Sequence, residues 1–383
     1  MHLMYLMALL PAIGGLIYYF CSKRIVWLEW LGCVILGLAT SATCHMIAIC
    51  GMTADIETWS GVVTQAEHHP EWVEEYRQAH TRTWTTGSGK NRQTHTETYY
   101  TTEHDTHPEH WEEHLDFGET SEQKEISLAR FNDVRQKFGG KVVDGGKQDT
   151  HHGGHFDGGD NNIYAVRNMT GHVFPVTTIR HFENRIKAAP TVFSFAKVPT
   201  NVPVYNWPEN PNYQQSDRLI GEPRVSPLEF DRFNSRLGPR KKVNVIMINF
   251  GLKDSSMSEW QKAKWVGGKK NDLVVCYGRV NSDGIAGWAK AFGWSESEGC
   301  KRNIESIMLG KQVNNDLLPI LEREIAQNYK KKDWHKFDYI TIEPPSWAYM
   351  ALAIVMCLTQ AGYWFWASMN EFGKEPKKQR FLY

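Results

Sequence analysis

The feature that most constrains this chain is the placement of three long apolar runs, two at its start and one near its end. Residues 1–20 contain no charged side chain, and residues 25–52 contain only Glu29 and the weakly basic His45. The third run, residues 346–370, begins directly after two prolines. About 20 apolar residues, at about 1.5 Å each, span the hydrocarbon core of a bilayer. The sequence therefore predicts three transmembrane helices, one over each run.

Basic residues beside these runs predict their orientation. Lys23 and Arg24 separate the first two runs, and a basic tail, residues 371–383, follows the third. Because cytoplasmic segments carry an excess of Lys and Arg, both basic segments are expected in the cytoplasm. Residues 53–345 are then expected outside it, which in a bacterial inner membrane means the periplasm. A cleaved signal peptide is the alternative for the first run, but that run lacks a basic start.

The polar middle of the chain is expected to form an extracytoplasmic domain in two portions, the first of which is β-rich and covers residues 53–200. Residues 81–85 and 94–100 are rich in β-branched and aromatic residues and flank a Gly-Ser-Gly-Lys-Asn turn, which is typical of a β-hairpin. Residues 67–72 and 107–111 each place a Trp shortly after His-Pro-Glu. This echo predicts paired strand ends with equivalent aromatic packing.

The rest of the β-rich portion is expected to hold one helix and one long loop. Residues 121–138 carry apolar side chains at helical spacing, and Gly139 and Gly140 follow them as a stop signal. Residues 144–162 are dense in Gly, His, Asp and Asn, which predicts a loop without a core of its own.

The second portion, residues 201–345, alternates strand and helix. Residues 243–250 are typical of a buried strand, residues 256–265 of a short helix, and residues 272–277 of another strand. Together they predict a β-α-β unit, with two further helical stretches after Ser306. The predicted fold class is therefore a membrane-anchored α+β protein.

Part of this portion resembles a known family. An apolar strand, a helix running into Trp-Val-Gly-Gly-Lys-Lys-Asn-Asp (residues 265–272) and a second strand make residues 243–330 similar to the TPM domain of membrane-anchored extracytoplasmic proteins. The TPM relatives include proposed phosphatases and accessory subunits of membrane complexes. Residues 288–293 stand where those relatives usually have Gly-Tyr-Gly. The arrangement over residues 53–345 also resembles uncharacterised membrane proteins of bacteriophages and some bacteria, through residues 237–244 and 267–272.

Histidine clustering suggests a metal site. Eleven of the sixteen histidines lie between His68 and His155, and neutral imidazole is a ligand for Zn, Cu and Ni. Spacings of three or four residues would place pairs of them on one face of a helical turn, with zinc as the default ion. The alternative is that they are surface groups hydrogen-bonded to carboxylates. The candidate ligands are His104, His107, His110 and His114.

Two further patterns could carry chemistry. Residues 151–155, His-His-Gly-Gly-His, with Asp157 and Asp160, could chelate a metal from a loop. Cys276 and Cys300 are the only cysteines of the extracytoplasmic part, and in an oxidising compartment they could form a disulfide. A buried free thiol is the alternative for Cys276, since it lies in an expected core strand.

The leading hypothesis is a membrane protein without catalytic activity or cofactor, whose external domain binds other membrane or envelope proteins, including its own copies. The alternative is a metal-dependent extracytoplasmic enzyme, with zinc as the default ion, phosphatase-like in the sense that the resemblance implies. A transporter or channel would need oligomerisation, because three crossings per chain are too few. Nucleic acid is not an expected partner, because 43 basic side chains balance 43 acidic ones.

Overall fold

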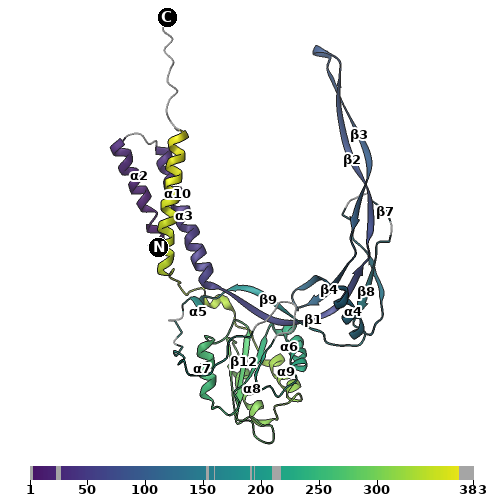
Figure 1. The fold of residues 1–383 in the computed structure, drawn as a ribbon, viewed down its shortest axis with the longest axis vertical. Helices are drawn as coiled ribbons and strands as arrows, with labels where there is room; N and C mark the ends of the chain where they lie inside the picture. Colours follow the sequence, from purple (N-terminus) through teal and green to yellow (C-terminus); the bar gives the residue numbers. More distant parts are fainter. Residues whose placement is uncertain are drawn as a thin grey trace. The chain divides into compact units, whose positions relative to one another are not determined.

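The computed structural model (Figure 1) shows a mixed α+β protein with three β-sheets, and it describes residues 3–22, 27–151, 155–158, 160–189, 192–193, 195–208 and 217–370. The chain divides into two units. The helical unit comprises Met1–Ile56, His181–Ala196 and Asp333–Tyr383, and the mixed unit comprises Glu57–Arg180 and Lys197–Lys332. The basic residues that predicted the orientation, Lys23, Arg24 and those of the tail, lie outside the described residues.

Two of the described helices, not the three predicted, are long and apolar enough to cross a membrane. They are α3 (Trp27–Thr53) and α10 (Ser346–Asn370), with mean hydropathies of 1.9 and 1.4 over their apolar spans. The first apolar run instead forms α1 (Leu3–Leu6) and α2 (Leu9–Ser22). Its 14-residue helix is about 21 Å long, short of the roughly 30 Å of hydrocarbon. The break has a physical cause, because the ring of Pro11 would clash with the carbonyl of Met7 in a continuous helix.

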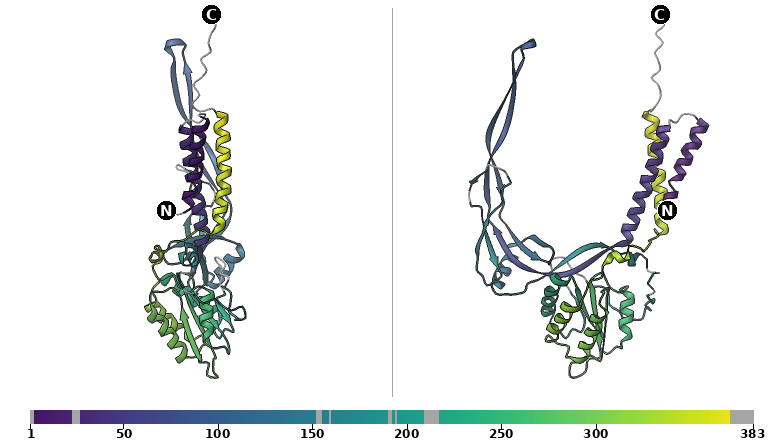
Figure 2. Two further views of the ribbon diagram at one scale, coloured as in Figure 1. Left: turned by 90° about the vertical axis from the view of Figure 1, so that its left-hand side faces the viewer. Right: turned by 180° about the vertical axis from the view of Figure 1, so that it is seen from behind.

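Helices α2, α3 and α10 run side by side within the helical unit (Figures 1 and 2). Gln360 on α10 and Cys33 on α3 form a buried polar contact. The Gln360 amide donates to the Cys33 carbonyl at 3.2 Å, and the Cys33 thiol donates to Gln360 Oε1 at 2.9 Å. The Tyr363 hydroxyl donates to the carbonyl of Glu29 at 2.8 Å, close to Gly32. These contacts tie the two long helices together.

Two short elements complete the helical unit, α5 (Arg185–Ala188) and η2 (Trp334–Phe337). Arg185 donates to the carbonyls of Asp338 and Ile340, at 2.8 and 3.2 Å. The Trp334 indole donates to the carbonyl of Glu183 at 2.9 Å. The segment before α10 is thereby fixed to residues 183–185, about 150 positions earlier in the chain.

A six-stranded sheet organises the first part of the mixed unit. Its order is β5-β4-β1-β8-β6, with β9 also pairing with β1. One face packs against α4 (Leu128–Lys137) through a core that includes Val63, Leu115, Phe131 and Val134. The strands are β1 (Ala54–His69), β4 (His110–Asp116), β5 (Ser121–Ile126), β6 (Val143–Lys147), β8 (Asn162–Arg167) and β9 (Pro175–Glu183).

Two predictions for this region were wrong in part. Residues 121–126 form strand β5 rather than the start of a helix, since they pair antiparallel with β4. The helix begins after Ser127, whose hydroxyl accepts from the Arg130 amide at 3.3 Å, and it ends at Lys137, with the predicted stop signal following at Gly139, which has a positive φ. The loop predicted over residues 144–162 contributes most of β6 and all of β7, because main-chain pairing with β8 and β2 needs no apolar side chains.

The predicted hairpin is confirmed and is longer than expected. Strands β2 (Trp72–Thr86) and β3 (Gln93–His107) pair over their whole length, from Trp72 opposite His107 to Thr86 opposite Gln93. Figure 2 shows them as a long two-stranded ribbon. The short strand β7 (His155–Gly158) adds to β2 only at Val73–Tyr76. We call residues 77–102, the part beyond β7, the arm.

The second part of the mixed unit is an α/β layer, and its predicted β-α-β unit is confirmed. The sheet order is β10-β11-β12-β13, parallel except for β13. Helices α6, α8 and α9 cover one face and α7 the other. The elements are β10 (Leu219–Gly221), α6 (Pro227–Lys241), β11 (Asn244–Asn249), α7 (Ser256–Lys264), β12 (Asp272–Gly278), β13 (Trp288–Phe292), α8 (Glu298–Gly310) and α9 (Leu317–Asn328).

The disulfide considered from the sequence does not form in this structure. Cys276 and Cys300 are both buried free thiols. Cys276 points to the α7 side of the sheet, where it packs with Ile248 and Trp288. Cys300 on α8 belongs to the core on the opposite face. The strand between the two thiols prevents them from meeting, which leaves the buried free thiol as the observed state.

Candidate metal centre

The candidate centre lies where the six-stranded sheet gives way to the three-stranded sheet of β2, β3 and β7, at the base of the hairpin that carries the arm. The two His-Pro-Glu segments meet here in antiparallel register, with His68 opposite Trp111 and Trp72 opposite His107. Each tryptophan stacks on a histidine of the other His-Pro-Glu segment. The ring centroids are 4.6 Å apart for Trp72 and His107, and 5.4 Å apart for Trp111 and His68. The predicted pairing of strand ends with equivalent aromatic packing is confirmed.

The strands are interrupted here, at residues 70–71 and 108–109, because both segments contain a proline. We call this break in the two strands the crossing. Proline has no N–H to donate, so the ladder stops after His69 and restarts at Trp72, and on the other chain segment it stops at His107 and restarts at His110. One group of histidines and carboxylates therefore lies on each side of the crossing. We call them the arm-side group and the sheet-face group.

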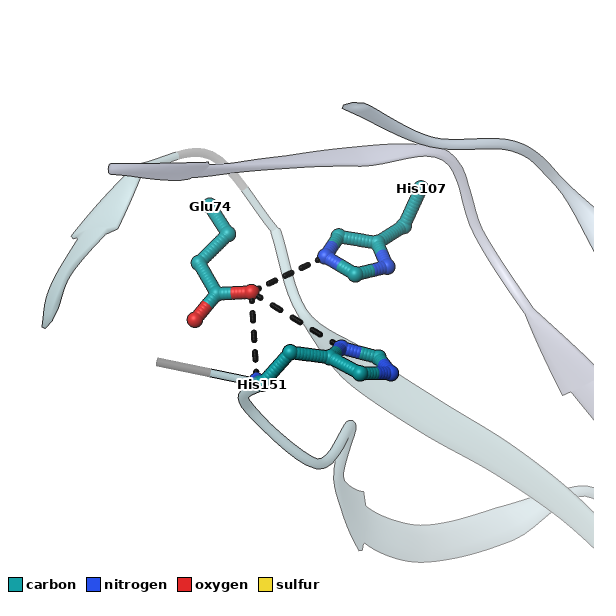
Figure 3. Close-up of side chains that lie close together, drawn as sticks. All are labelled: Glu74, His107 and His151. Carbon is teal, nitrogen blue, oxygen red and sulfur yellow. Dashed lines mark hydrogen bonds and ion pairs between the residues drawn. The ribbon is translucent and has the colours of Figure 1, made fainter. Parts of the chain in front are cut away.

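The arm-side group consists of Glu74, His107 and His151 (Figure 3). The Glu74 side chain is fully buried, and its Oε2 lies 3.0 Å from His107 Nε2 and 3.9 Å from His151 Nδ1. The backbone N–H of His151 also donates to Oε2, at 3.3 Å. The two imidazole rings stack at 5.1 Å, and the His151 side chain is 67% exposed. Two imidazoles and one carboxylate thus face one point that is open to solvent.

The sheet-face group consists of Glu67 and His69 on β1 and His110, Glu112 and His114 on β4. Successive side chains of a strand point to opposite faces, so these alternate positions share the face opposite to α4. Glu67 Oε2 lies 3.0 Å from His114 Nε2 and 3.4 Å from His69 Nε2. The hydrogen bond from His114 holds the pKa of Glu67 well below its usual range, and the same bond raises the pKa of His114.

The four predicted ligands do not form one site. His104 lies on the arm side of the crossing, 57% exposed, and pairs with Glu75 at 3.5 Å. His107 joins the arm-side group, whereas His110 and His114 belong to the sheet-face group. The expected helical turn was wrong, because residues 93–107 and 110–116 are strands. In a strand, a spacing of four still places His110 and His114 on the same face, which is why that pair stays together.

Several ligand-type residues were missed by sequence reasoning. Glu67, Glu74 and Glu112 face the histidines, yet each is an ordinary carboxylate in the sequence. A usable signal existed, because antiparallel pairing of the two His-Pro-Glu segments, with their prolines at the same break, places His69 opposite His110 and then Glu67 opposite Glu112. Of the proposed loop chelate, His151 is placed in the arm-side group. His152 and the side chains of His155 and Asp157 lie outside the described part of the chain.

Comparisons with known proteins give no relative for this chain: no protein-family model, curated protein or solved structure matches it. The similarity to TPM domains and to phage membrane proteins therefore stays a prediction.

Proposed function

We propose that this chain is a membrane-anchored assembly protein without catalytic activity, whose arm binds the arm of a neighbouring copy. The observation that carries the proposal is the arm itself. It is a long hairpin whose two strands pair with each other, while its outer edges and both faces are turned to solvent. A two-stranded hairpin is only marginally stable in water, so a long one is expected to gain stability from a partner.

The surface of the arm fits a protein partner. Most of its side chains are exposed, including the aromatic residues Trp84, Tyr99 and Tyr100, the last of which is 62% exposed. Aromatic side chains supply large contact areas at protein interfaces. Arg82 lies opposite Glu97, and the remaining charges, Arg77, Lys90 and Arg92, lie at the base and the tip of the arm, so the threonine-rich middle presents few charges to a second strand.

A second copy of the chain is the partner that this geometry favours. In the described sheet, β3 is an edge strand over its whole length, and β2 is an edge strand beyond Tyr76. Each copy thus offers one β2 edge and one β3 edge, and edge strands pair readily with other strands. Anchoring in a common membrane would raise the local concentration of copies.

The anchor is proposed to be α3 and α10, which both pass the length and composition requirement for a membrane span. If only these two helices cross, residues 54–345 lie on one side, and the basic segments at 23–24 and 371–383 lie on the other. The excess of Lys and Arg favours the cytoplasm for the basic side. The orientation inferred from three crossings is therefore kept with two, and the mixed unit is proposed to be periplasmic or external.

The test is crosslinking of the full chain in native membranes, with a photo-crosslinking amino acid at position 100. We expect a product of twice the chain's mass. In a shortened variant, residues 82–97 are replaced by Asn-Gly, which joins Thr81 to its partner Thr98 through a two-residue turn. This variant, with the probe kept at position 100, is expected to lose most of the product and to run as a smaller particle in detergent.

The control carries the same probe at position 252, because Leu252 is 89% exposed and lies in the α/β layer. It should give no dimeric product. If the shortened arm leaves particle size and crosslinking unchanged, the proposal is wrong. A product with a different mass would assign the arm to another protein.

The arm-side group favours a second candidate function, a zinc-dependent enzyme. Two histidines and one glutamate form the ligand set of catalytic zinc sites, in which the fourth position is left for water. The exposed side of His151 would leave that position accessible. On this hypothesis the purified chain hydrolyses p-nitrophenyl phosphate when zinc is added, and His107→Gln abolishes the activity while the control His104→Gln retains it. Activity that persists in His107→Gln would refute this function.

A further inference from the structure

The sheet-face group occupies one row of side chains on each of two neighbouring strands. In the register of β1 and β4, His69 lies directly opposite His110, Glu67 opposite Glu112, and Gln65 opposite His114. All five ionisable side chains come from strand positions, so their places are fixed by the hydrogen-bond ladder rather than by a loop. A site built on strands is held more precisely than one on loops.

Carboxylates face each other across this row. Glu67 lies opposite Glu112, and Glu112 lies opposite Glu125 on β5, so three adjacent strands each place a glutamate at the same level of the sheet. Like charges directly opposite each other destabilise a sheet. Glu67 is also buried, and the Gln65 amide and the His114 ring contact its carboxylate, while Glu112 and Glu125 add further negative charge at the same level. A cation at this level would remove the conflict.

The histidines point their nitrogens at these carboxylates at distances suited to a shared metal ion. The ligand atoms of Glu67, Glu112 and His114 all lie within 4.8 Å of one another. The nearest nitrogen–oxygen distances are 3.0 Å for His114 and 3.4 Å for His69, both to Glu67, and 3.6 Å for His110 to Glu112. In a tetrahedral zinc site, neighbouring ligand atoms are on the order of 3.3 Å apart.

The hydrogen bonding of His110 and His69 favours a metal over a proton network. His110 Nδ1 lies 3.0 Å from the carbonyl of Pro108, which can only accept, so Nδ1 carries the hydrogen. In a neutral ring, Nε2 then presents its lone pair to Glu112, and two acceptors face each other. His69 Nε2 is buried and makes no hydrogen bond with any residue of the described chain. A backbone carbonyl that fixes the tautomer is the usual outer-shell partner of a metal-binding histidine.

We propose that the sheet-face group binds one divalent transition-metal ion, with Glu67, Glu112 and His114 as its convergent ligands and one of the two stacked rings, His69 or His110, as the fourth. Zinc is the expected ion, because it takes imidazole and carboxylate ligands in four-coordinate sites. The ion would crosslink β1 to β4 beside the crossing and hold the base of the arm in place. This site is independent of the arm-side group and of the proposed function.

The test measures zinc bound to the full chain, purified in detergent with a tag that contains no histidine. All variants carry His107→Gln, so that the arm-side group cannot contribute. After treatment with EDTA and dialysis against dilute zinc chloride, the parent is expected to hold one more zinc ion per chain than the variant with Glu67→Gln and His114→Gln. With Co²⁺ in place of zinc, the parent should show the visible absorption of a four-coordinate site, and the variant should lose it.

A matched control and a milder variant keep the test decisive. Glu75→Gln with His104→Gln removes another histidine–carboxylate pair, 3.5 Å apart, and should leave the zinc content unchanged. Glu112→Gln changes a partly exposed ligand, so it should weaken zinc binding while the far-UV circular dichroism stays that of the parent. Equal zinc content in the parent and in both ligand variants, or equal loss in the control, would overturn the proposal.

Discussion

The arm and the sheet of the α/β layer are both β structure, yet they contrast in burial. Strands β11 and β12 are buried at every position, with apolar side chains packed on both faces. The arm exposes both faces and both edges along most of its length. Burial of apolar surface is the main stabilising term of a fold, so the α/β layer should dominate the stability of the mixed unit.

The two regions also differ in whether they have a core with buried polar groups to pair. The α/β layer pairs buried polar groups within its own core, as when Asn234 accepts from the Val245 amide at 2.9 Å and Asn244 donates to Asp272 at 2.7 Å. The arm buries none of its side chains, so it has no core of its own. An ordered hairpin that adds little stability is better explained by a contact outside the chain than by folding, and four measurements test this division.

The largest effect is expected from truncation in the α/β core. Phe233 on α6 is fully buried and stacks on Phe230 at 5.4 Å between ring centroids. Phe233→Ala removes those contacts and leaves a cavity, so the free energy of unfolding should fall by about 3–5 kcal/mol. Urea titration of the full chain in detergent, followed by tryptophan fluorescence, measures the loss.

The control for this prediction lies on the outside of the same layer. Leu309 on α8 is largely exposed, and Leu309→Ala should change the free energy of unfolding by less than about 0.5 kcal/mol. Equal losses in the two variants would mean that the α/β layer is not the stable part of the unit.

A pH effect of intermediate size is expected from Asp231, also on α6. Burial raises the pKa of this carboxyl to about 6, against the opposing effect of Arg218 and in the same direction as Asp217. The folded state therefore keeps the proton to higher pH than the unfolded state does. Stability should fall as the pH rises from about 4 to about 6, by at most about 3 kcal/mol. Urea titrations at several pH values measure the slope.

Asp231→Asn should flatten this dependence, because the amide does not titrate. Glu97→Gln on the arm is the matched control and should leave the slope as it is in the unaltered chain. A slope that persists in Asp231→Asn would assign the pH dependence to another group.

The sequence predicted the α/β layer well because its pattern is local. Apolar runs such as residues 243–250 can be recognised without knowing their neighbours, and the β-α-β unit followed from their order. Residues 121–126 were misassigned because their partner, β4, determines their conformation. The composition of the first apolar run predicts a full span, but Pro11 interrupts the helix there, and composition alone does not contain that effect.

The candidate site was predictable only in its histidines. His110 and His114 were named, but the glutamates that face them are common residues whose meaning depends on cross-strand register. Register is a long-range property here, since β1 and β4 are about 40 residues apart in the chain. The His-Pro-Glu echo carried that register, and reading it together with strand alternation would have brought Glu67 and Glu112 into the set.

A smaller effect is expected where the two parts of the mixed unit touch. Gly238 on α6 packs so closely on β1 that a Cβ there would lie 1.8 Å from the carbonyl oxygen of Ser60. Gly238→Ala must displace one backbone, so it should lower the free energy of unfolding by about 1–3 kcal/mol. Gly299 on α8 has open space around it, and Gly299→Ala should instead stabilise slightly, by up to about 1 kcal/mol. The same urea titration compares them, and a neutral Gly238→Ala would show that β1 and α6 are not in contact.

The smallest effect on stability, and the sharpest on assembly, is expected from Tyr100. Tyr100→Thr removes an exposed ring from the arm and keeps a β-branched side chain that favours strands, so the free energy of unfolding should change by less than about 0.5 kcal/mol. Particle size in detergent should nevertheless shift toward the monomer, because the ring is proposed to contact a second copy. Leu252→Thr, at a highly exposed position of the α/β layer, should change neither the free energy of unfolding nor the particle size. A Tyr100→Thr variant that unfolds more easily but keeps its particle size would reverse the comparison, since the arm would then act within the chain rather than between chains.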